Sequence, residues 1–156
     1  MEKHDGERIG VVAALVRSTF LTNAVYAESA REYGLTSQQG QLLCVLMAQP
    51  YGMSELGAML GLAKSSLTGL VDRTERNGLV QRRPDPHDSR ALRIALTRKG
   101  SELAAEFYAE TCARIENLTT GLAVADRDAL ADLLGRVVQD NKVPVVFLEP
   151  GEGAHS

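Results

Sequence analysis

The chain has 156 residues, 44% of them hydrophobic and 24% charged, and its formal net charge at pH 7 is −3. This length and composition allow one domain, or two small lobes, with an ordinary hydrophobic core. No apolar run approaches the ~20 residues of a membrane span, and the stretch before Val11 lacks the apolar core of a signal peptide. The composition argues against a membrane or secreted protein, so we expect a cytoplasmic one.

Helical periodicity dominates the first third of the chain. Apolar residues recur at helical spacing from Glu7 to Tyr33, and Gly34 is typical of a helix stop. Thr36 and Gln39 form the pattern of a capping box, in which each side chain accepts a hydrogen bond from the other's backbone amide. The capping box predicts the start of a second helix, which Pro50 ends.

Two further helices are predicted, separated by a glycine. Ser54 is expected to cap a short helix over Glu55–Leu60, and Gly61 to terminate it. The next helix covers about residues 63–77. Four residues at positions i, i+3, i+4 and i+7 form a stripe along one side of this helix that is expected to be buried: Leu67, Leu70, Val71 and Thr74.

The opposite face of this helix carries short polar side chains, cations and one glycine. Its members are Ser65, Gly69, Asp72 and Arg76, flanked by Ser66 and Arg73 on one side and by Lys64 and Thr68 on the other. Small hydroxyls and a glycine let a helix backbone approach another surface closely, as base recognition in a major groove requires. Two helices joined by a glycine-containing turn, with this face on the second, predict a helix-turn-helix.

Positive charge is concentrated in the same region. Residues 62–100 hold nine cationic and four acidic side chains, a formal charge of +5, which leaves −8 for the rest of the chain. Clustered cations favour contact with a polyanion, because they displace counterions condensed on phosphates. A solvated basic face is the alternative interpretation, and the pattern between the charges favours nucleic acid.

Two strands are predicted after Gly78. Leu79–Arg83 and Leu92–Leu96 are expected to pair as a hairpin. In the second segment a large apolar residue occupies every second position, which is the period of a half-buried strand. The connection over residues 84–91 is too long for a tight turn and contains two prolines, so it should project as a stiff loop.

The loop carries His87 and Arg90 near its tip. A guanidinium on a loop beside a recognition helix suits the narrow, electronegative minor groove. Asp88 would repel phosphate, so we interpret it as an intramolecular partner of a neighbouring arginine that fixes the loop.

The C-terminal third is predicted to form two helices with apolar stripes. Thr97 caps the first, and Asp126 caps the second after a break near residues 119–123. Both helices could pack within one monomer, but a central helix-turn-helix leaves them few partners, which favours intertwining with a second copy. The apolar segment Val143–Leu148 is expected to lie on protein, either its own subunit or the partner.

The order of these elements, and above all the sequence GLVQRRPDPHDSRALRIALTRKG, resembles the MarR family of bacterial winged helix-turn-helix transcription regulators. The resemblance covers roughly Ile9 to Val138 and is sharpest over Ser65–Gly100, in LVDRTERNGLV, the D-P-x-D-x-R-A wing and the L-T-x-x-G opening of the next helix. It implies homodimers on pseudo-palindromic operators, a recognition helix in the major groove, a wing arginine in the minor groove, and DNA affinity modulated by small molecules or oxidants.

By position, Ser65, Ser66, Thr68 and Arg73 match the family's recognition-helix contacts, and Arg90 matches its wing arginine. Many members carry a long polar side chain where this chain has Gly69, so the operator sequence cannot be transferred from a relative.

The expected fold class is mainly α with a small β-hairpin wing (α+β), in a winged helix-turn-helix whose terminal helices form a homodimer. We divide the chain into a dimerisation helix (1–35), the DNA-binding lobe (36–100), C-terminal dimerisation helices and tail (101–148), and a loose tail (149–156). The expected partners are double-stranded DNA, a second copy and a small-molecule effector, with no membrane. The predicted DNA contacts are Lys64, Ser65, Ser66, Thr68, Arg73, Arg76, His87 and Arg90.

Enzymatic activity is not expected. The three histidines, His4, His87 and His155, are not placed to converge, and Cys44 and Cys112 lack the spacing of a metal site. We therefore predict no catalytic residues, no metal and no cofactor.

Two alternatives to a small-molecule-controlled regulator remain open. One is redox sensing through Cys112, which the neighbouring Glu110 and Glu116 disfavour and Arg114 favours; Cys44 is expected to be buried and inert. The other is a winged-helix module that binds protein instead of DNA.

Overall fold

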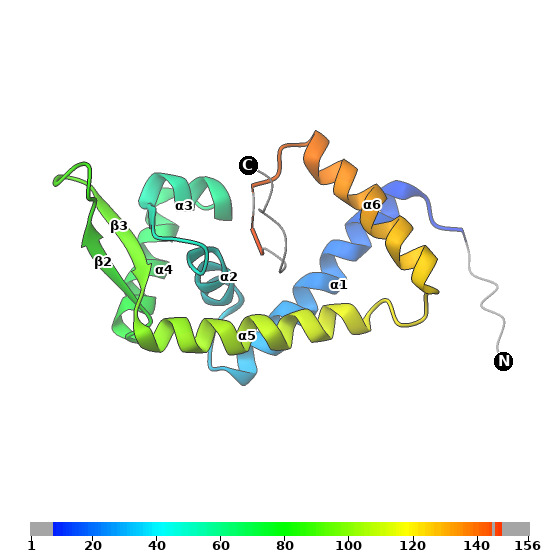
Figure 1. Cartoon of the computed structure of the whole chain (residues 1–156), viewed down its shortest axis with the longest axis horizontal. Coiled ribbons are helices and arrows are strands. Elements are labelled where there is room, and N and C mark those ends of the chain that lie inside the picture. Colours follow the sequence, from blue (N-terminus) through cyan, green and yellow to red (C-terminus); the bar gives the residue numbers. More distant parts are fainter. Residues whose placement is uncertain (1–7, 145, 148–156) are drawn as a thin grey trace.

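The computed structural model describes residues 8–144 and 146–147, and within them it has six helices and a three-stranded sheet (Figure 1). The helices are α1 (Val11–Glu32), α2 (Ser37–Leu46), α3 (Met53–Leu60), α4 (Lys64–Arg76), α5 (Arg98–Asn117) and α6 (Val124–Asp140). The strands are β1 (Tyr51–Gly52), β2 (Val80–Pro84) and β3 (Leu92–Leu96). The expected fold, mainly α with a small β-wing, is confirmed.

Several helix ends form as their local sequence predicts. The amide of Gln39 donates to Thr36 Oγ1 (3.1 Å) and the amide of Thr36 donates to Gln39 Oε1 (3.0 Å), so the capping box of α2 is confirmed. Thr97 caps α5 by accepting from the Gly100 amide at 3.0 Å. Gly34 and Gly61, predicted to end α1 and α3, both have a positive φ, as does Gly78 after α4.

Other helix ends differ from the prediction. α3 begins at Met53 with Gly52 at its N-cap, so Ser54 lies inside the helix and does not cap it. α6 begins at Val124, which places Asp126 in the first turn, where its carboxylate faces the positive end of the helix dipole. α1 begins at Val11, and the predicted start at Glu7 lies outside the described residues. α2 already ends at Leu46, ahead of Pro50.

The sheet is antiparallel with the order β1-β3-β2. The predicted hairpin is confirmed with β2 shifted by one residue, and Val80 pairs with Leu96 while Pro84 pairs with Leu92. β1, in which Tyr51 pairs with Ile94, was not predicted. It joins the segment before α3 to the wing and so fixes the helix-turn-helix to the sheet.

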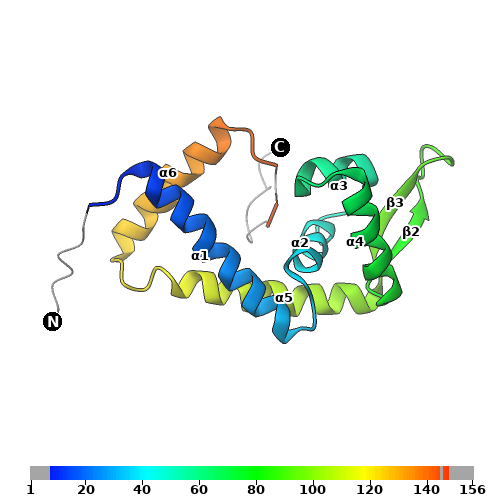
Figure 2. The same ribbon diagram turned by 180° about the vertical axis from the view of Figure 1, so that it is seen from behind.

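The core lies where α2, α4 and the sheet meet α5. Leu42, Leu70, Ile94 and Phe107 are fully buried there. α1 crosses α5, and the two helices share a buried hydrogen bond of 2.8 Å between the hydroxyls of Ser29 and Thr111. The lobe formed by α2, α3, α4 and the sheet packs at one end of α5, which runs from the base of the hairpin to the turn before α6 (Figures 1 and 2).

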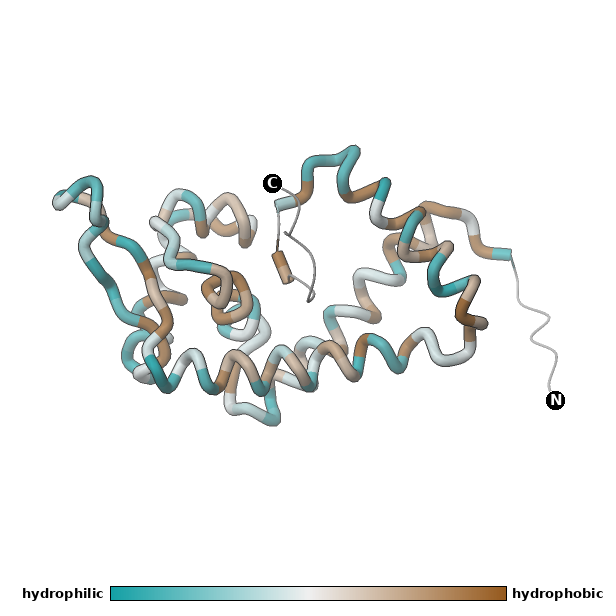
Figure 3. Tube along the Cα trace, viewed as in Figure 1, coloured by the Kyte–Doolittle hydropathy of each residue, from teal (hydrophilic) through white to brown (hydrophobic). Residues whose placement is uncertain are grey.

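The opposite end of the molecule is built from the first part of α1 and from α6 (Figures 1 and 2). α6 buries none of its residues within the described chain. Hydrophobic positions recur along both helices at this end (Figure 3). Large exposed apolar side chains here include Val12 (74% exposed), Phe20 (73%), Val124 (64%) and Leu133 (57%).

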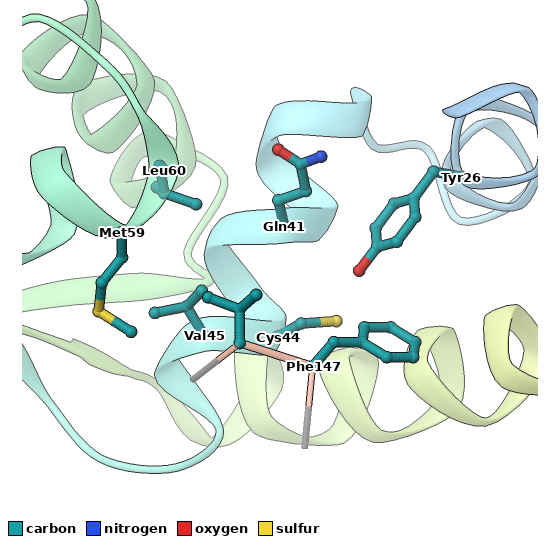
Figure 4. Close-up of a pocket in the computed structure, with 8 residues that line it drawn as sticks. Tyr26, Gln41, Cys44, Val45, Met59, Leu60 and Phe147 are labelled. Carbon is teal, nitrogen blue, oxygen red and sulfur yellow. The ribbon is translucent and has the colours of Figure 1, made fainter. Parts of the chain in front are cut away.

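The C-terminal segment turns back onto its own subunit. The Phe147 ring packs against Tyr26, with ring centroids 5.7 Å apart, and against Tyr108 at 4.8 Å. The sequence left open whether this segment lies on its own subunit or on a partner, and in the single chain the Phe147 ring lies on its own subunit (Figure 4). The loose tail predicted over 149–156 lies outside the described residues. None of the described helices is long and apolar enough to span a bilayer.

Candidate nucleic-acid interface

Helix α4 buries the stripe that its sequence predicts. Leu67, Leu70, Val71 and Thr74 are all buried, and the Thr74 hydroxyl donates to the Leu70 carbonyl at 2.7 Å. Because this stripe holds the helix against the core, the opposite side is turned outward. We call that side the recognition face: Lys64, Ser65, Ser66, Thr68, Gly69, Asp72, Arg73 and Arg76.

The first turn of α4 presents exposed groups of short reach. Lys64, Ser65 and Ser66 are exposed, whereas Thr68 is half-buried. The Thr68 hydroxyl donates to the Lys64 carbonyl at 2.8 Å, so its oxygen is left as an acceptor. This turn therefore combines a cation with hydroxyls close to the backbone, a set suited to phosphates and base edges.

Gly69 makes room for an arginine. A Cβ at this position would stand 3.3 Å from Nη1 of Arg73, so the guanidinium lies over the glycine. Arg73 and Arg76 are both exposed and occupy the last turn of α4. The long polar side chain that the family often has at position 69 is absent, and the Arg73 guanidinium covers part of the space above it.

Arg82 on β2 binds two carboxylates of α4, which sequence reasoning did not find. Its Nη2 donates to Asp72 Oδ1 at 2.6 Å and its Nη1 to Glu75 Oε1 at 2.7 Å, while its backbone amide donates to Glu75 Oε2 at 3.2 Å. The bond to Asp72 is the largest cause of a raised Arg82 pKa. The only signal in the sequence was the spacing of Asp72 and Glu75, three positions apart on one helix.

Two carboxylates, Asp85 and Asp88, hold the wing loop by interactions within the loop and with β3. Asp85 Oδ2 pairs with Arg93 Nε at 3.0 Å, and its Oδ1 accepts the His87 amide at 2.8 Å, the largest cause of a lowered Asp85 pKa. Asp88 accepts the backbone amide of Arg90 at 3.0 Å. Asp88 therefore binds a neighbouring arginine within the loop, as predicted, but through the backbone amide, whereas Asp85 makes the ion pair with an arginine side chain.

The wing turns two of its polar side chains outward. His87 and Arg90 are exposed, and Arg90 forms no ion pair with any described residue, nor do Lys64, Arg73 and Arg76. The hairpin lies beside α4 at one end of the molecule (Figures 1 and 2). The structure thus brings the predicted residues of α4 and those of the wing to the same lobe, with Thr68 as the least exposed of them.

Neither a metal site nor a reactive thiol is formed by this lobe. Groups of three or more His, Cys, Asp or Glu side chains able to hold a metal do not occur among residues 8–144 and 146–147. Cys44 is buried as expected, and burial raises the pKa of its thiol to about 11. Cys112 is half-buried in α5. His4 and His155 lie outside the described residues.

Comparison with known proteins identifies relatives over most of the chain. The MarR family profile matches residues 33–91. The chain is 31% identical over 106 residues to YkoM of Bacillus subtilis, an uncharacterized HTH-type transcriptional regulator, which covers 67% of this chain and 69% of YkoM. It is 30% identical over 135 residues to the HTH-type transcriptional repressor NicR of Pseudomonas putida, which covers 84% of each chain.

A solved relative is similar along nearly its whole length. The transcriptional repressor CouR bound to a 23-mer DNA duplex superposes with a TM-score of 0.72 at 26% identity, covering 88% of this chain and 99% of CouR. CouR from Rhodococcus jostii RHA1 bound to p-coumaroyl-CoA gives a TM-score of 0.74 at 26% identity, over 87% of this chain and 93% of that one. The similarity therefore includes the flanking helices as well as the lobe.

Proposed function

The chain belongs to the MarR family of transcriptional regulators, which are not enzymes, and from this premise we propose that it is a homodimeric repressor of a pseudo-palindromic operator. The observation that carries the proposal is the recognition face, which is mostly exposed, combines short hydroxyl side chains with cations, and lies beside a wing with an outward arginine. A protein-binding winged helix would be expected to present a more apolar face.

On this proposal α4 lies in the major groove and the wing in the minor groove. Ser65, Ser66 and the Thr68 oxygen contact base edges or nearby phosphates, while Lys64, Arg73 and Arg76 neutralise phosphates. Arg90, with His87 beside it, enters the adjacent minor groove. Phosphate contacts set the position of the helix, and the hydroxyls contribute to sequence preference.

The dimer follows from the exposed apolar surface of α1 and α6. A solvent-facing set that includes Phe20, Val124 and Leu133 is costly in water, and pairing with a second copy buries it. In a dimer with a two-fold axis through these helices, each subunit places one recognition face on its own side of the axis. Two α4 helices about 34 Å apart would then enter successive major grooves on one side of the duplex.

We further propose that a small molecule modulates DNA affinity. Support comes from CouR, for which both a DNA complex and a p-coumaroyl-CoA complex are known. A ligand that binds the DNA-competent and DNA-incompetent arrangements unequally shifts affinity by the ratio of its two affinities.

The wing provides the test. The operator is first selected from genomic fragments that the wild-type protein retains at low salt, and affinity is then measured by fluorescence anisotropy. We expect Arg90→Ala to weaken binding roughly 10-fold on A/T-containing sites, because a minor-groove guanidinium is lost.

The matched control is Ser89→Ala, an exposed neighbour on the same loop, which should leave affinity unchanged. Equal affinity and equal salt dependence for Arg90→Ala and wild type would remove the wing from the proposal. Failure to retain any duplex at low salt would instead favour a protein-binding module.

A further inference from the structure

Arg73 and Gly69 share the middle of the recognition face. Gly69 lies opposite the buried stripe of α4 and has no side chain. A Cβ at this position would stand 3.3 Å from Nη1 of Arg73, so the guanidinium lies over the glycine. This placement follows from helix geometry, because side chains lean toward the N-terminus of a helix and reach the residue four positions earlier. The outward surface at Gly69 is therefore formed by a guanidinium from the following turn.

The two acidic side chains of α4 are bound to a different arginine. Asp72 Oδ1 accepts a hydrogen bond from Arg82 Nη2 at 2.6 Å, and Glu75 Oε1 accepts one from Arg82 Nη1 at 2.7 Å. Within residues 8–144 and 146–147, Arg73 itself forms no ion pair. Neither carboxylate therefore draws the guanidinium of Arg73 away from Gly69, and its positive charge is available to an external partner.

The other two cations of the recognition face, Lys64 and Arg76, are the first and last residues of α4. The helix has 13 residues and is therefore about 20 Å long, which exceeds the ~12 Å width of a major groove. When α4 lies in a major groove, as proposed, its ends come closer to the phosphate backbones than its middle does. Lys64 and Arg76 therefore suit phosphates, whereas the guanidinium over Gly69 faces base edges.

A guanidinium distinguishes guanine from the other bases by its shape. Its two parallel N–H groups match the acceptors O6 and N7 on the major-groove edge of guanine, whereas adenine presents one acceptor and one donor there. The absence of a side chain at Gly69 lets the guanidinium lie close to the helix backbone, so the helix itself can approach the base pair. Arg73 and Gly69 together thus form a surface complementary to a G·C pair.

We propose that Arg73 binds a guanine in each half of the operator through hydrogen bonds to O6 and N7, and that Gly69 gives its guanidinium the room to do so. This inference rests on the proposed function and adds a base preference to it, a G·C pair opposite the middle of α4. The charge of Arg73 still contributes to the neutralisation of nearby phosphates, because a guanidinium has five N–H donors and the base takes two of them.

Base substitutions in the operator test the inference with the wild-type protein. In the duplex that this protein retains at low salt, each G·C pair is replaced by A·T, symmetrically in both halves. We expect one pair of symmetric positions at which the affinity, measured by fluorescence anisotropy, falls ~10-fold or more. 7-Deazaguanine at those positions keeps the Watson–Crick pair but has C–H in place of N7. It should weaken binding ~5-fold, because a hydrogen bond from a charged donor is lost.

Substitutions at Arg73 and Gly69 identify the side chain responsible for the preference. Arg73→Ala should bind the G·C, A·T and 7-deazaguanine duplexes within ~2-fold of one another. Arg73→Lys keeps the charge without the planar fork, so it should retain the wild-type salt slope and lose most of the guanine preference. Gly69→Leu keeps the arginine but fills the space under its guanidinium, which should also lower the preference. Arg76→Ala, at an exposed arginine of the same helix, is the matched control and should weaken binding to all three duplexes equally.

Thermal unfolding of each variant shows whether it is folded, and the comparison of duplexes with the wild-type protein depends on no variant. Wild-type binding that no replacement of guanine weakens would overturn the proposal, and so would a folded Arg73→Ala that keeps the guanine preference. The full preference in Gly69→Leu would contradict the role of Gly69. A wild-type protein that retains no duplex at low salt would refute the proposed function and this inference with it, a result distinct from DNA binding without a guanine preference.

Discussion

Arg82 belongs to the basic segment of the sequence, yet its guanidinium is bound within the lobe to Asp72 and Glu75. The two carboxylates are 52% and 40% exposed, so the pairs contribute only about 0.5–1 kcal/mol to stability. We expect these ion pairs to affect DNA binding more than they affect stability. Asp72 lies on the recognition face, and on the proposed function Arg82 offsets a negative charge that would otherwise repel phosphates.

We predict that Arg82→Ala weakens operator binding by roughly 10-fold or more while lowering the unfolding free energy by less than about 1 kcal/mol. Anisotropy and urea unfolding measure the two effects. Arg98→Ala is the control, because Arg98 is 94% exposed in its pair with Glu102. If repulsion is the cause, adding Asp72→Asn to Arg82→Ala restores part of the affinity, and a double variant no better than the single one would contradict this cause.

At the scale of elements, the start of α5 packs on the turn that ends α4. The amide of Thr97 donates to the Leu79 carbonyl at 3.0 Å, and its hydroxyl donates to the Gly78 carbonyl at 2.6 Å. A Cβ at Gly100 would overlap the Leu79 carbonyl oxygen. The L-T-x-x-G motif therefore combines a helix cap with a close backbone approach that only glycine allows.

Gly100→Ala separates this packing from helix propensity. Propensity alone would stabilise α5 by ~1 kcal/mol, whereas overlap with a backbone carbonyl costs at least ~2 kcal/mol. We therefore expect a net loss of stability, seen as a lower urea midpoint. Ser101→Ala, at an exposed position in the same turn, should stay within about 0.5 kcal/mol of wild type. An unchanged or higher midpoint for Gly100→Ala would rule out the close approach.

Elements specified by neighbouring residues could be predicted from the sequence. The capping box of Thr36 and Gln39, the stop at Gly61 and the buried stripe of α4 each depend on residues within two turns. The candidate contacts on α4 followed from the same periodicity, because a buried stripe determines which residues face outward.

Features that depend on distant parts of the chain could not be predicted in this way. β1 has two residues, too few to show alternation, and it exists because Tyr51 meets Ile94 on β3. The partner of Arg82 and the packing of Phe147 on Tyr26 likewise depend on tertiary structure. The ion pair between Asp85 and Arg93 was not predicted either, because it depends on the pairing of β2 with β3.

At the scale of the whole molecule, the two ends differ in chemistry. One end carries the exposed cations of α4 and the wing, and the other carries exposed apolar side chains of α1 and α6. On the proposed function, joining two copies through the apolar end would double the phosphate contacts on one duplex, and affinity for DNA grows with the number of phosphates neutralised. If each copy neutralises about four phosphates, the dimer should show a log–log salt slope near −7.

Leu133→Asp tests this connection between the ends. Leu133 is 57% exposed in the single chain, so a carboxylate there should leave the protomer folded but should oppose burial between copies. We expect the molar mass, measured by light scattering after gel filtration, to fall from twice the mass of the chain to the mass of one chain. The salt slope of DNA binding should fall to about half.

Gln139→Asp introduces the same charge on the opposite side of α6 and controls for charge alone. It should stay dimeric and keep the wild-type salt slope. A dimeric Leu133→Asp with unchanged DNA binding would place the subunit contact elsewhere on the chain. A monomeric Leu133→Asp with the full wild-type salt slope would instead mean that one lobe makes all the phosphate contacts, and the second copy would then be unnecessary for binding DNA.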